Sequence, residues 1–223
     1  MKRKNILVNN EVYHIYNRSI ANYTIFNTEA DFQRFLQLLK FFQLTKQPTK
    51  FSRFLELEAV NREGFFNYLD SFTKNEQEIV QIIAYSLMPT HIHLILKQLK
   101  ENGISMFMSD ILNSYTRYFN TKHHRKGPLW ESKFQNVFVT KDEILLHLTR
   151  YLHLNPVTAN FVNLPQDWEF SSYKEYLSGE EKICCYKNVL DFTPKKYQQF
   201  VDERISYQKL LAKIKNITID WTI

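Results

Sequence analysis

The chain has few residues of the types that mark disordered or disulfide-stabilised proteins. Only 4 Gly and 6 Pro occur among 223 residues, which argues against a disordered chain. The two cysteines, Cys184 and Cys185, are adjacent, so they are unsuited to bridging each other and form no C-x-x-C metal pair. Reduced cysteines of this kind indicate a cytoplasmic protein.

Long hydrophobic runs and an excess of acid are also missing. No segment approaches the roughly 18 consecutive apolar residues of a membrane span, and the N-terminal residues hold no apolar stretch of signal-peptide length. A hydrophobic content of 44% and this length suit one globular domain with additions. The 29 Lys and Arg against 23 Asp and Glu give a net charge of +6, which favours a polyanionic partner, nucleic acid above all, rather than a membrane.

Alternating and helical patterns predict the element order β-α-β-β-α-β of an α+β fold, the ferredoxin-like split βαβ antiparallel sheet, with one added C-terminal helix. The predicted strands are 11–18, 79–87, 91–97 and 131–139, and the predicted helices follow Thr28, cover 104–120 and follow Thr140. Thr28 with Asp31, and Thr140 with Glu143, resemble capping boxes. Pro156 is expected to end the added helix, because the residue before a proline avoids the α region.

Two histidines lie two residues apart in the segment MPTHIHLIL, residues 88–96. Residues i and i+2 of a strand point to the same face, so His91 and His93 are expected to project side by side. Two neighbouring imidazoles are a common way to hold a metal ion. By itself, a His-x-His pair is more often a structural feature of a core.

Tyr151 and Asn155 lie one turn apart on one face of the added helix. A helix that packs by its leucines could aim both side chains at the histidine pair, and Asn155 offers an amide oxygen as a third metal ligand. Two imidazoles and one oxygen leave coordination positions open for a substrate phosphate. A phenol becomes a competent nucleophile when a cation polarises the phosphorus that it attacks.

Several further motifs occur in a fixed order with these residues and make the pattern more specific. They are YHIYNRS at 13–19, MPTHIHLIL at 88–96, SYTRYFN at 114–120, GPLWESKF at 127–134 and YLHLNPV at 151–157. Together with Asp167-Trp168 and Phe170–Tyr173 they span roughly residues 13–173. In this order they resemble the single-tyrosine transposases of the HUH superfamily, most closely the REP-associated tyrosine transposase group.

The resemblance implies a metal-dependent nuclease and strand transferase for single-stranded or hairpin DNA. His91 and His93 match the family's metal ligands, Asn155 matches the polar residue that completes the metal site, and Tyr151 matches the nucleophile. The product would be a 5′-phosphotyrosine link with a free 3′-OH. Two imidazoles suit Mn²⁺ better than Mg²⁺, although Mg²⁺ is also a candidate. Family members include homodimers and monomers.

The resemblance also suggests a division of the chain. We expect residues 1–160 to form the catalytic domain, with 46–77 as a helical insertion that is longer than usual for the family. Residues 161–223 are expected to form a C-terminal extension packed on or beside that domain.

A basic segment between the second core helix and the fourth strand is the predicted DNA-contacting region, since cations neutralise phosphates. Its predicted contact residues are Arg117, Lys122, Arg125, Lys126 and Lys133. Trp130 is expected either to stack on a base or, more often for such a residue, to lie in the core.

Several alternatives stay open at this stage. Tyr115 and Tyr118 are rival nucleophiles, and His147 lies one turn before Tyr151. The same fold could serve as a non-catalytic nucleic-acid-binding module. A metal-bound water could also attack in place of the tyrosine, which would make the protein a hydrolase.

Overall fold

The computed structural model describes residues 6–73, 76–207 and 209–210. Its four strands are β1 (Val12–Arg18), β2 (Val80–Met88), β3 (His91–Gln98) and β4 (Gln135–Phe138). They form one sheet in the order β2-β3-β1-β4, and all neighbouring strands are antiparallel. The central strands β1 and β3 largely alternate apolar residues that fill the core with polar residues on the other face.

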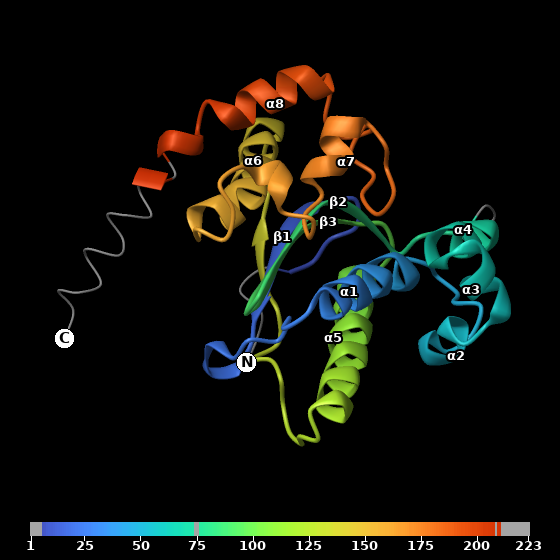
Figure 1. Cartoon of the computed structure of the whole chain (residues 1–223). Helices are drawn as coiled ribbons and strands as arrows, with labels where there is room; N and C mark the ends of the chain where they lie inside the picture. Colours follow the sequence, from blue (N-terminus) through green and yellow to red (C-terminus); the bar gives the residue numbers. More distant parts are fainter. Residues whose placement is uncertain (1–5, 74–75, 208, 211–223) are drawn as a thin grey trace.

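The helices complete the predicted ferredoxin-like order, and this prediction of the fold is confirmed. Helix α1 (Glu29–Phe42) follows β1, and helix α5 (Gly103–Lys122) follows β3. Helix α6 (Asp142–Thr158) follows β4 and packs against β2 and β3. Figure 1 shows α1 and α5 on one side of the sheet and α6 on the other. The sheet therefore separates two helical layers.

Three short helices fill the segment between α1 and β2 that the sequence marked as an insertion: α2 (Phe51–Leu55), α3 (Glu58–Glu63) and α4 (Phe65–Thr73). Aromatic rings hold this segment on α1, since Phe54 lies 5.3 Å from Phe41 and 5.5 Å from Phe65, measured between ring centroids. The insertion therefore has a small core of its own that is continuous with the main core.

The C-terminal part packs on the α6 side of the sheet through α7 (Tyr173–Ser178) and α8 (Pro194–Asp202). Two short 3-10 helices, η1 (Ile20–Asn22) and η2 (Pro165–Asp167), connect other elements. The Trp168 indole N–H donates to the Leu87 carbonyl at 3.0 Å, and the Tyr176 hydroxyl donates to the Ile83 carbonyl at 2.8 Å. No helix in the described ranges is both long enough and apolar enough to cross a membrane. The predicted extension also includes residues 211–223, which lie outside the described part of the chain.

Three details of the predicted elements are wrong. Helix α6 starts at Asp142 after Lys141, with no side-chain cap, so Thr140 does not cap it. The helix also continues past Pro156 to Thr158. The proline removes one donor, but the bond at the end of the helix, from Ala159 N–H to Asn155 C=O at 2.9 Å, is kept. The fourth strand is shorter than 131–139, since its pairing with β1 covers only Gln135–Phe138.

The other predicted cap, at the start of α1, is present. The Asp31 carboxylate accepts from the backbone N–H of Thr28 at 2.9 Å and from the Thr28 hydroxyl at 3.0 Å. Asp31 is fully buried and also accepts from Tyr118 and Lys122 of α5, at 2.8 and 2.7 Å. The cap therefore also ties α1 to α5.

Candidate functional site

His91 and His93 lie side by side on the sheet face that α6 covers. Their ring centroids are 5.1 Å apart and the rings are perpendicular. In each ring the Nδ1 atom already has a hydrogen-bond partner: the Thr90 hydroxyl at 3.0 Å for His91, and His14 Nε2 at 3.1 Å for His93. Both rings therefore keep Nε2 for a ligand, with their orientation fixed by the bond at Nδ1.

His14 is a member of this cluster that the sequence analysis did not identify. It stacks on His93 with ring centroids 5.3 Å apart. Antiparallel pairing places Tyr16 opposite His93 and Arg18 opposite His91, so alternate residues of β1 line the same face. The signal was present as the alternation of His14, Tyr16 and Arg18, but only the strand register shows that these residues meet the histidine pair.

All three imidazoles have lowered pKa values. Burial, followed by the neighbouring His91 and His14, lowers the pKa of His93 to about 3. Burial lowers the pKa of His14 to about 4. Burial and then the nearby Arg18 cation lower the pKa of His91. The rings are therefore neutral at physiological pH and keep the lone pairs that a metal ion requires.

Tyr151 extends from α6 toward this cluster. Its ring lies 6.1 Å from the His93 ring, edge to face, and 44% of the residue is exposed to solvent. The rival tyrosines lie on α5 in the opposite helical layer. The buried Tyr115 hydroxyl donates to the Ile25 carbonyl at 2.7 Å, and the Tyr118 hydroxyl donates to Asp31. Of the three tyrosines, Tyr151 is the one that a substrate at the histidines can reach.

Asn155 lies one turn after Tyr151 and is half-buried. Its Nδ2 atom is buried and has no hydrogen-bond partner among the described residues. Leaving a buried amide group unpartnered is costly, so this position calls for a ligand that the protein alone does not supply. The orientation of an amide follows from its partners, so Asn155 can turn either Oδ1 or Nδ2 toward that ligand.

The residues present fit a divalent metal ion, with one restriction. Within the described ranges, no three His, Cys, Asp or Glu side chains gather in a way that could hold a metal ion. A metal at His91 and His93 would therefore need an oxygen ligand of another kind, and the amide of Asn155 stays the predicted candidate for it. Nitrogen and amide-oxygen donors suit Mn²⁺ and tolerate Mg²⁺.

A cleft of about 680 Å³ opens beside the histidines, large enough for a segment of a nucleic-acid strand. It is lined by Tyr16, Asn17, Arg18, Asn22, Thr90, His91, Ile92, His93, Glu131, Ser132 and Gln135. Arg18 forms an ion pair with Glu131 at the rim, where the second Arg18–Glu131 bond measures 3.1 Å. Sequence patterns did not identify this pair, because its members lie 113 residues apart.

The five predicted DNA-contacting cations do not gather at this cleft. Arg117 and Lys122 lie on α5, in the other helical layer. The Arg125 guanidinium donates to Asn120 Oδ1 at 2.8 Å and to the Pro128 carbonyl at 2.9 Å, which orders the loop after α5. Lys126 and Lys133 are exposed on that loop and the segment after it.

The remaining candidates have structural partners. Trp130 is buried and donates its indole N–H to the Thr116 hydroxyl at 3.1 Å, so it lies in the core. His147 bonds Arg150 at 2.8 Å. His153 is fully buried between the Tyr197 hydroxyl and the Ser172 hydroxyl, at 2.7 and 2.8 Å, and joins α6 to the C-terminal part.

Comparison with known proteins agrees with this arrangement. Residues 62–155 match the model of the family described as "Transposase IS200 like", and this range includes both histidines, Tyr151 and Asn155. Over this range the chain is similar to the IS200-like transposases. A Haemophilus influenzae protein named for the REP-associated tyrosine transposases is 25% identical over 111 residues, which are 45% of this chain and 62% of that relative. The match thus covers less than two thirds of the relative's length.

A solved structure shares the fold. It is the REP-associated tyrosine transposase bound to a REP hairpin, with a TM-score of 0.51 and 15% sequence identity over 87% of this chain and 96% of that one. The predicted fold is therefore confirmed, and the resemblance that the motifs suggested is found again as similarity to transposases over residues 62–155.

Proposed function

We propose that this chain is a transposase that cleaves and rejoins single-stranded DNA through a covalent bond to Tyr151. The observation that carries the proposal is the position of the exposed Tyr151 ring, 6.1 Å from one of two neutral, side-by-side histidines. An accessible phenol beside imidazoles whose Nε2 atoms can hold a metal ion suits attack on a phosphate bound there. The family match over residues 62–155 supports the same reaction.

The covalent step exchanges one P–O ester bond for another. The Tyr151 oxygen attacks the phosphorus, the bond from phosphorus to the 3′-oxygen breaks, and the phosphate remains on the tyrosine as a 5′-phosphotyrosine. The phenol proton is lost to solvent, and the departing 3′-oxygen gains a proton to become the 3′-OH. Because the ester is conserved, attack by a 3′-OH reverses the step and rejoins DNA.

The metal site would be held by His91 and His93 through Nε2 and by the amide of Asn155. A bound Mn²⁺ or Mg²⁺ would supply charge stabilisation to the phosphate. His14 and Thr90 fix the two imidazoles in place through their Nδ1 atoms. The neighbour solved with a REP hairpin supports hairpin DNA as the substrate.

The decisive experiment compares the full chain with Tyr151→Phe on labelled single-stranded hairpin DNA with Mn²⁺. The wild type should form a protein–DNA adduct that survives a denaturing gel. The variant should form none and lose cleavage by at least about 1,000-fold, because removal of a nucleophile costs orders of magnitude in rate. The control is Tyr23→Phe, which changes an exposed ring outside the site. Tyr197→Phe is unsuitable, because Tyr197 is buried.

Two results would replace the proposal. Cleavage by the variant without an adduct would mean that water attacks, which would make the protein a hydrolase. Tight binding of nucleic acid by the wild type with neither cleavage nor adduct, at any Mn²⁺ or Mg²⁺ concentration, would identify a non-catalytic binding module.

A further inference from the structure

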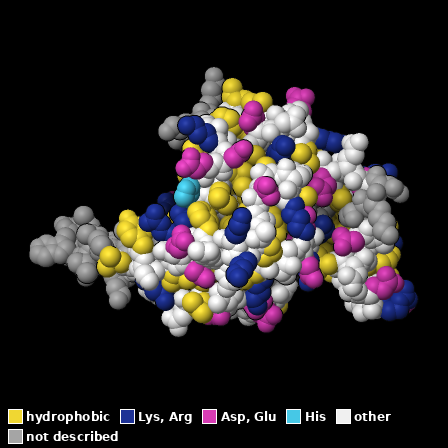
Figure 2. Space-filling model, turned by 90° about the horizontal axis from the view of Figure 1, so that it is seen from above, with side chains coloured by type: hydrophobic (Ala, Val, Ile, Leu, Met, Phe, Trp, Pro, Cys, Tyr) yellow, Lys and Arg dark blue, Asp and Glu magenta, His cyan; other side chains and the backbone are white. Residues whose placement is uncertain are grey.

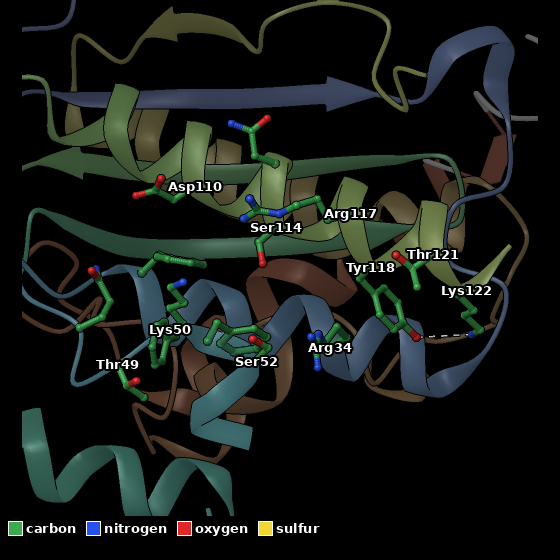
Figure 3. A pocket seen from close by; sticks show the side chains of 15 residues that line it. Arg34, Thr49, Lys50, Ser52, Asp110, Ser114, Arg117, Tyr118, Thr121 and Lys122 are labelled. Atoms are coloured by element: carbon green, nitrogen blue, oxygen red, sulfur yellow. Dashed lines mark hydrogen bonds between the residues drawn. The ribbon is translucent and has the colours of Figure 1, made fainter. Parts of the chain in front are cut away.

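A second and larger groove, about 1060 Å³ in volume, lies in the helical layer on the other side of the sheet. Its walls come from α1, the segment 47–52 with the start of α2, and one face of α5 (Figure 3). The residues that line it include four cations, Arg34, Lys50, Arg117 and Lys122, against one carboxylate, Asp110. The insertion 46–77 forms one wall, and α1 and α5 of the main fold form the others.

Arg34 is the unusual residue of this groove. Its guanidinium lies between two rings, 4.6 Å from the Phe51 centroid and 5.1 Å from the Tyr118 centroid. Its Nε atom is buried and has no hydrogen-bond partner in the described part of the chain. The rings stabilise a cation, but they accept none of its N–H groups in the plane of the guanidinium. A half-buried guanidinium that two rings hold in place, with no ion pair to a carboxylate in the described part of the chain, is suited to an anion from outside.

The other cations differ in how far they are already neutralised. Lys122 forms an ion pair with the buried Asp31 at 2.7 Å, so its charge is largely neutralised within the protein. Arg117 lies near Asp110, and each partly neutralises the other. Burial raises the pKa of the Asp110 carboxyl, and the charge of Arg117 opposes that rise. Lys50 is exposed, and no contact from it to a carboxylate occurs among the described residues. Arg34 and Lys50 therefore provide most of the unbalanced positive charge.

Neutral hydrogen-bonding groups lie between the cations. Figure 3 shows Ser114 and Thr121 on the same face of α5 as Arg117, with Thr49 and Ser52 on the opposite wall. Hydroxyl donors and separated cations along an open groove match a chain of phosphates rather than a single small ion. The volume is also at the upper end of what one small ligand fills.

The geometry points to a second nucleic-acid site, in which this groove holds the phosphodiester backbone of the substrate DNA at a segment remote from the cleaved bond. The inference rests on DNA being the substrate of the proposed function. Arg34 would contact a phosphate through its guanidinium edge, while Lys50 and Arg117 would neutralise neighbouring phosphates. Because the sheet separates the groove from Tyr151, this contact would serve DNA that extends beyond the catalytic cleft.

The test measures binding of a fluorescent DNA hairpin with single-stranded tails by anisotropy, in the Tyr151→Phe background so that no DNA is cleaved. The groove variant is Lys50→Ala with Arg117→Ala. Its matched control is Lys46→Ala with Arg53→Ala, which removes two exposed cations of the same region that do not line the groove. Both variants change the net charge equally. Ser114→Glu provides an independent change, since it places an acid on the groove wall.

The groove variant should bind about tenfold more weakly and lower the slope of log Kd against log salt by roughly 1.4 to 1.8, whereas the control should shift much less. Ser114→Glu should also weaken binding. Equal effects of groove and control variants would show that only total charge matters and would overturn the inference. A loss seen with an RNA hairpin of the same sequence but not with DNA would overturn the assignment to DNA.

The outcomes separate this inference from the proposed function. If the wild type forms the adduct and the groove variant binds like the control, the groove inference alone fails. If the groove variant loses binding but the wild type never forms an adduct, the proposed reaction fails and the binding site stands.

Discussion

The two faces of the sheet carry basic groups that differ in charge: neutral histidines on one face, and charged arginines and lysines on the other. On the α6 side, burial lowers the pKa values of His14 and His93 to about 4 and about 3, so the rings are neutral. On the α1 and α5 side, the half-buried Arg34 stays charged between two aromatic rings, since a guanidinium does not deprotonate in proteins. The first arrangement exposes lone pairs, and the second exposes N–H groups.

This difference in charge suits the two faces to different tasks, catalysis on one face and binding of substrate on the other. Neutral imidazoles that lie beside an exposed phenol suit metal binding and covalent attack. A fixed cation in a groove suits binding of a polyanion and takes no part in a reaction. Figure 2, which views the molecule from above the α6 side, shows lysines and arginines scattered among acids over that face rather than gathered in one patch. The groove between α1 and α5 is thus a different kind of surface, because four of the residues that line it are cations and one is an acid.

The largest expected effect of removing a single histidine is at His93. His93→Ala removes one of the two imidazoles and the partner of His14. It should abolish measurable Mn²⁺ binding by calorimetry and lower adduct formation at least about 100-fold, since the ligand set is reduced below what a divalent ion requires. Binding of hairpin DNA without metal should change by less than twofold.

His124→Ala is the control, because His124 is exposed on the loop after α5. If His93→Ala binds Mn²⁺ like the wild type, the metal lies elsewhere and the two-histidine site is wrong.

The next prediction concerns His14 as a positioning residue. His14→Phe keeps a ring in the stack but removes the hydrogen bond to His93 Nδ1. The Kd for Mn²⁺ should rise about 10- to 100-fold, as is usual when a partner of a metal-binding histidine is lost. His14→Gln keeps a hydrogen-bonding group and should recover part of the affinity. Equal affinity of all three proteins would show that His14 only fills space.

The sequence was sufficient for the fold and for the residues that are close together along the chain. The period-2 run around His91 and His93 and the cap at Thr28 have local causes, so they were readable without coordinates. The family resemblance also singled out Tyr151, and the structure places its ring beside His93.

Features that depend on tertiary contacts were missed. His14 joins the histidine cluster only through the register of β1 on β3, and no short pattern encodes that register. DNA contact by the basic segment stays a prediction, but closeness in sequence does not show which surface each of its residues joins. The end of α5 and its loop instead direct Arg117 to the groove and Arg125 to its own loop. Helix α6 continues past Pro156 because the residues around the proline are buried, and packing outweighs the local preference.

The smallest expected effects come from Asp31→Asn, which tests the groove side without removing a cation. Burial alone would raise the pKa of Asp31, but hydrogen bonds from Lys122, Tyr118 and Thr28 lower it below its ordinary value near 3.8. A carboxyl with a lowered pKa stabilises the fold above its ordinary pKa, and this stabilisation is lost as pH falls through the folded-state value. The free energy of unfolding of the wild type should therefore decrease as pH falls below about 4, and the variant should show a smaller decrease.

At neutral pH the same variant should lose about 1 to 2 kcal/mol of stability in denaturant unfolding, because a buried charged acceptor with several donors is replaced by a neutral one. The control Glu58→Gln, which changes an exposed residue in the first turn of α3, should leave both the stability and its pH dependence nearly unchanged.

The DNA affinity of Asp31→Asn should change in the opposite direction from its stability. Loss of the Asp31 carboxylate leaves Lys122 uncompensated at the groove, so binding of the hairpin should tighten by about twofold, because one freed lysine adds a single phosphate contact. If Asp31→Asn weakens DNA binding while the protein remains folded, Lys122 does not act on the groove, and the contrast between the two faces of the sheet rests on Arg34 and Lys50 alone.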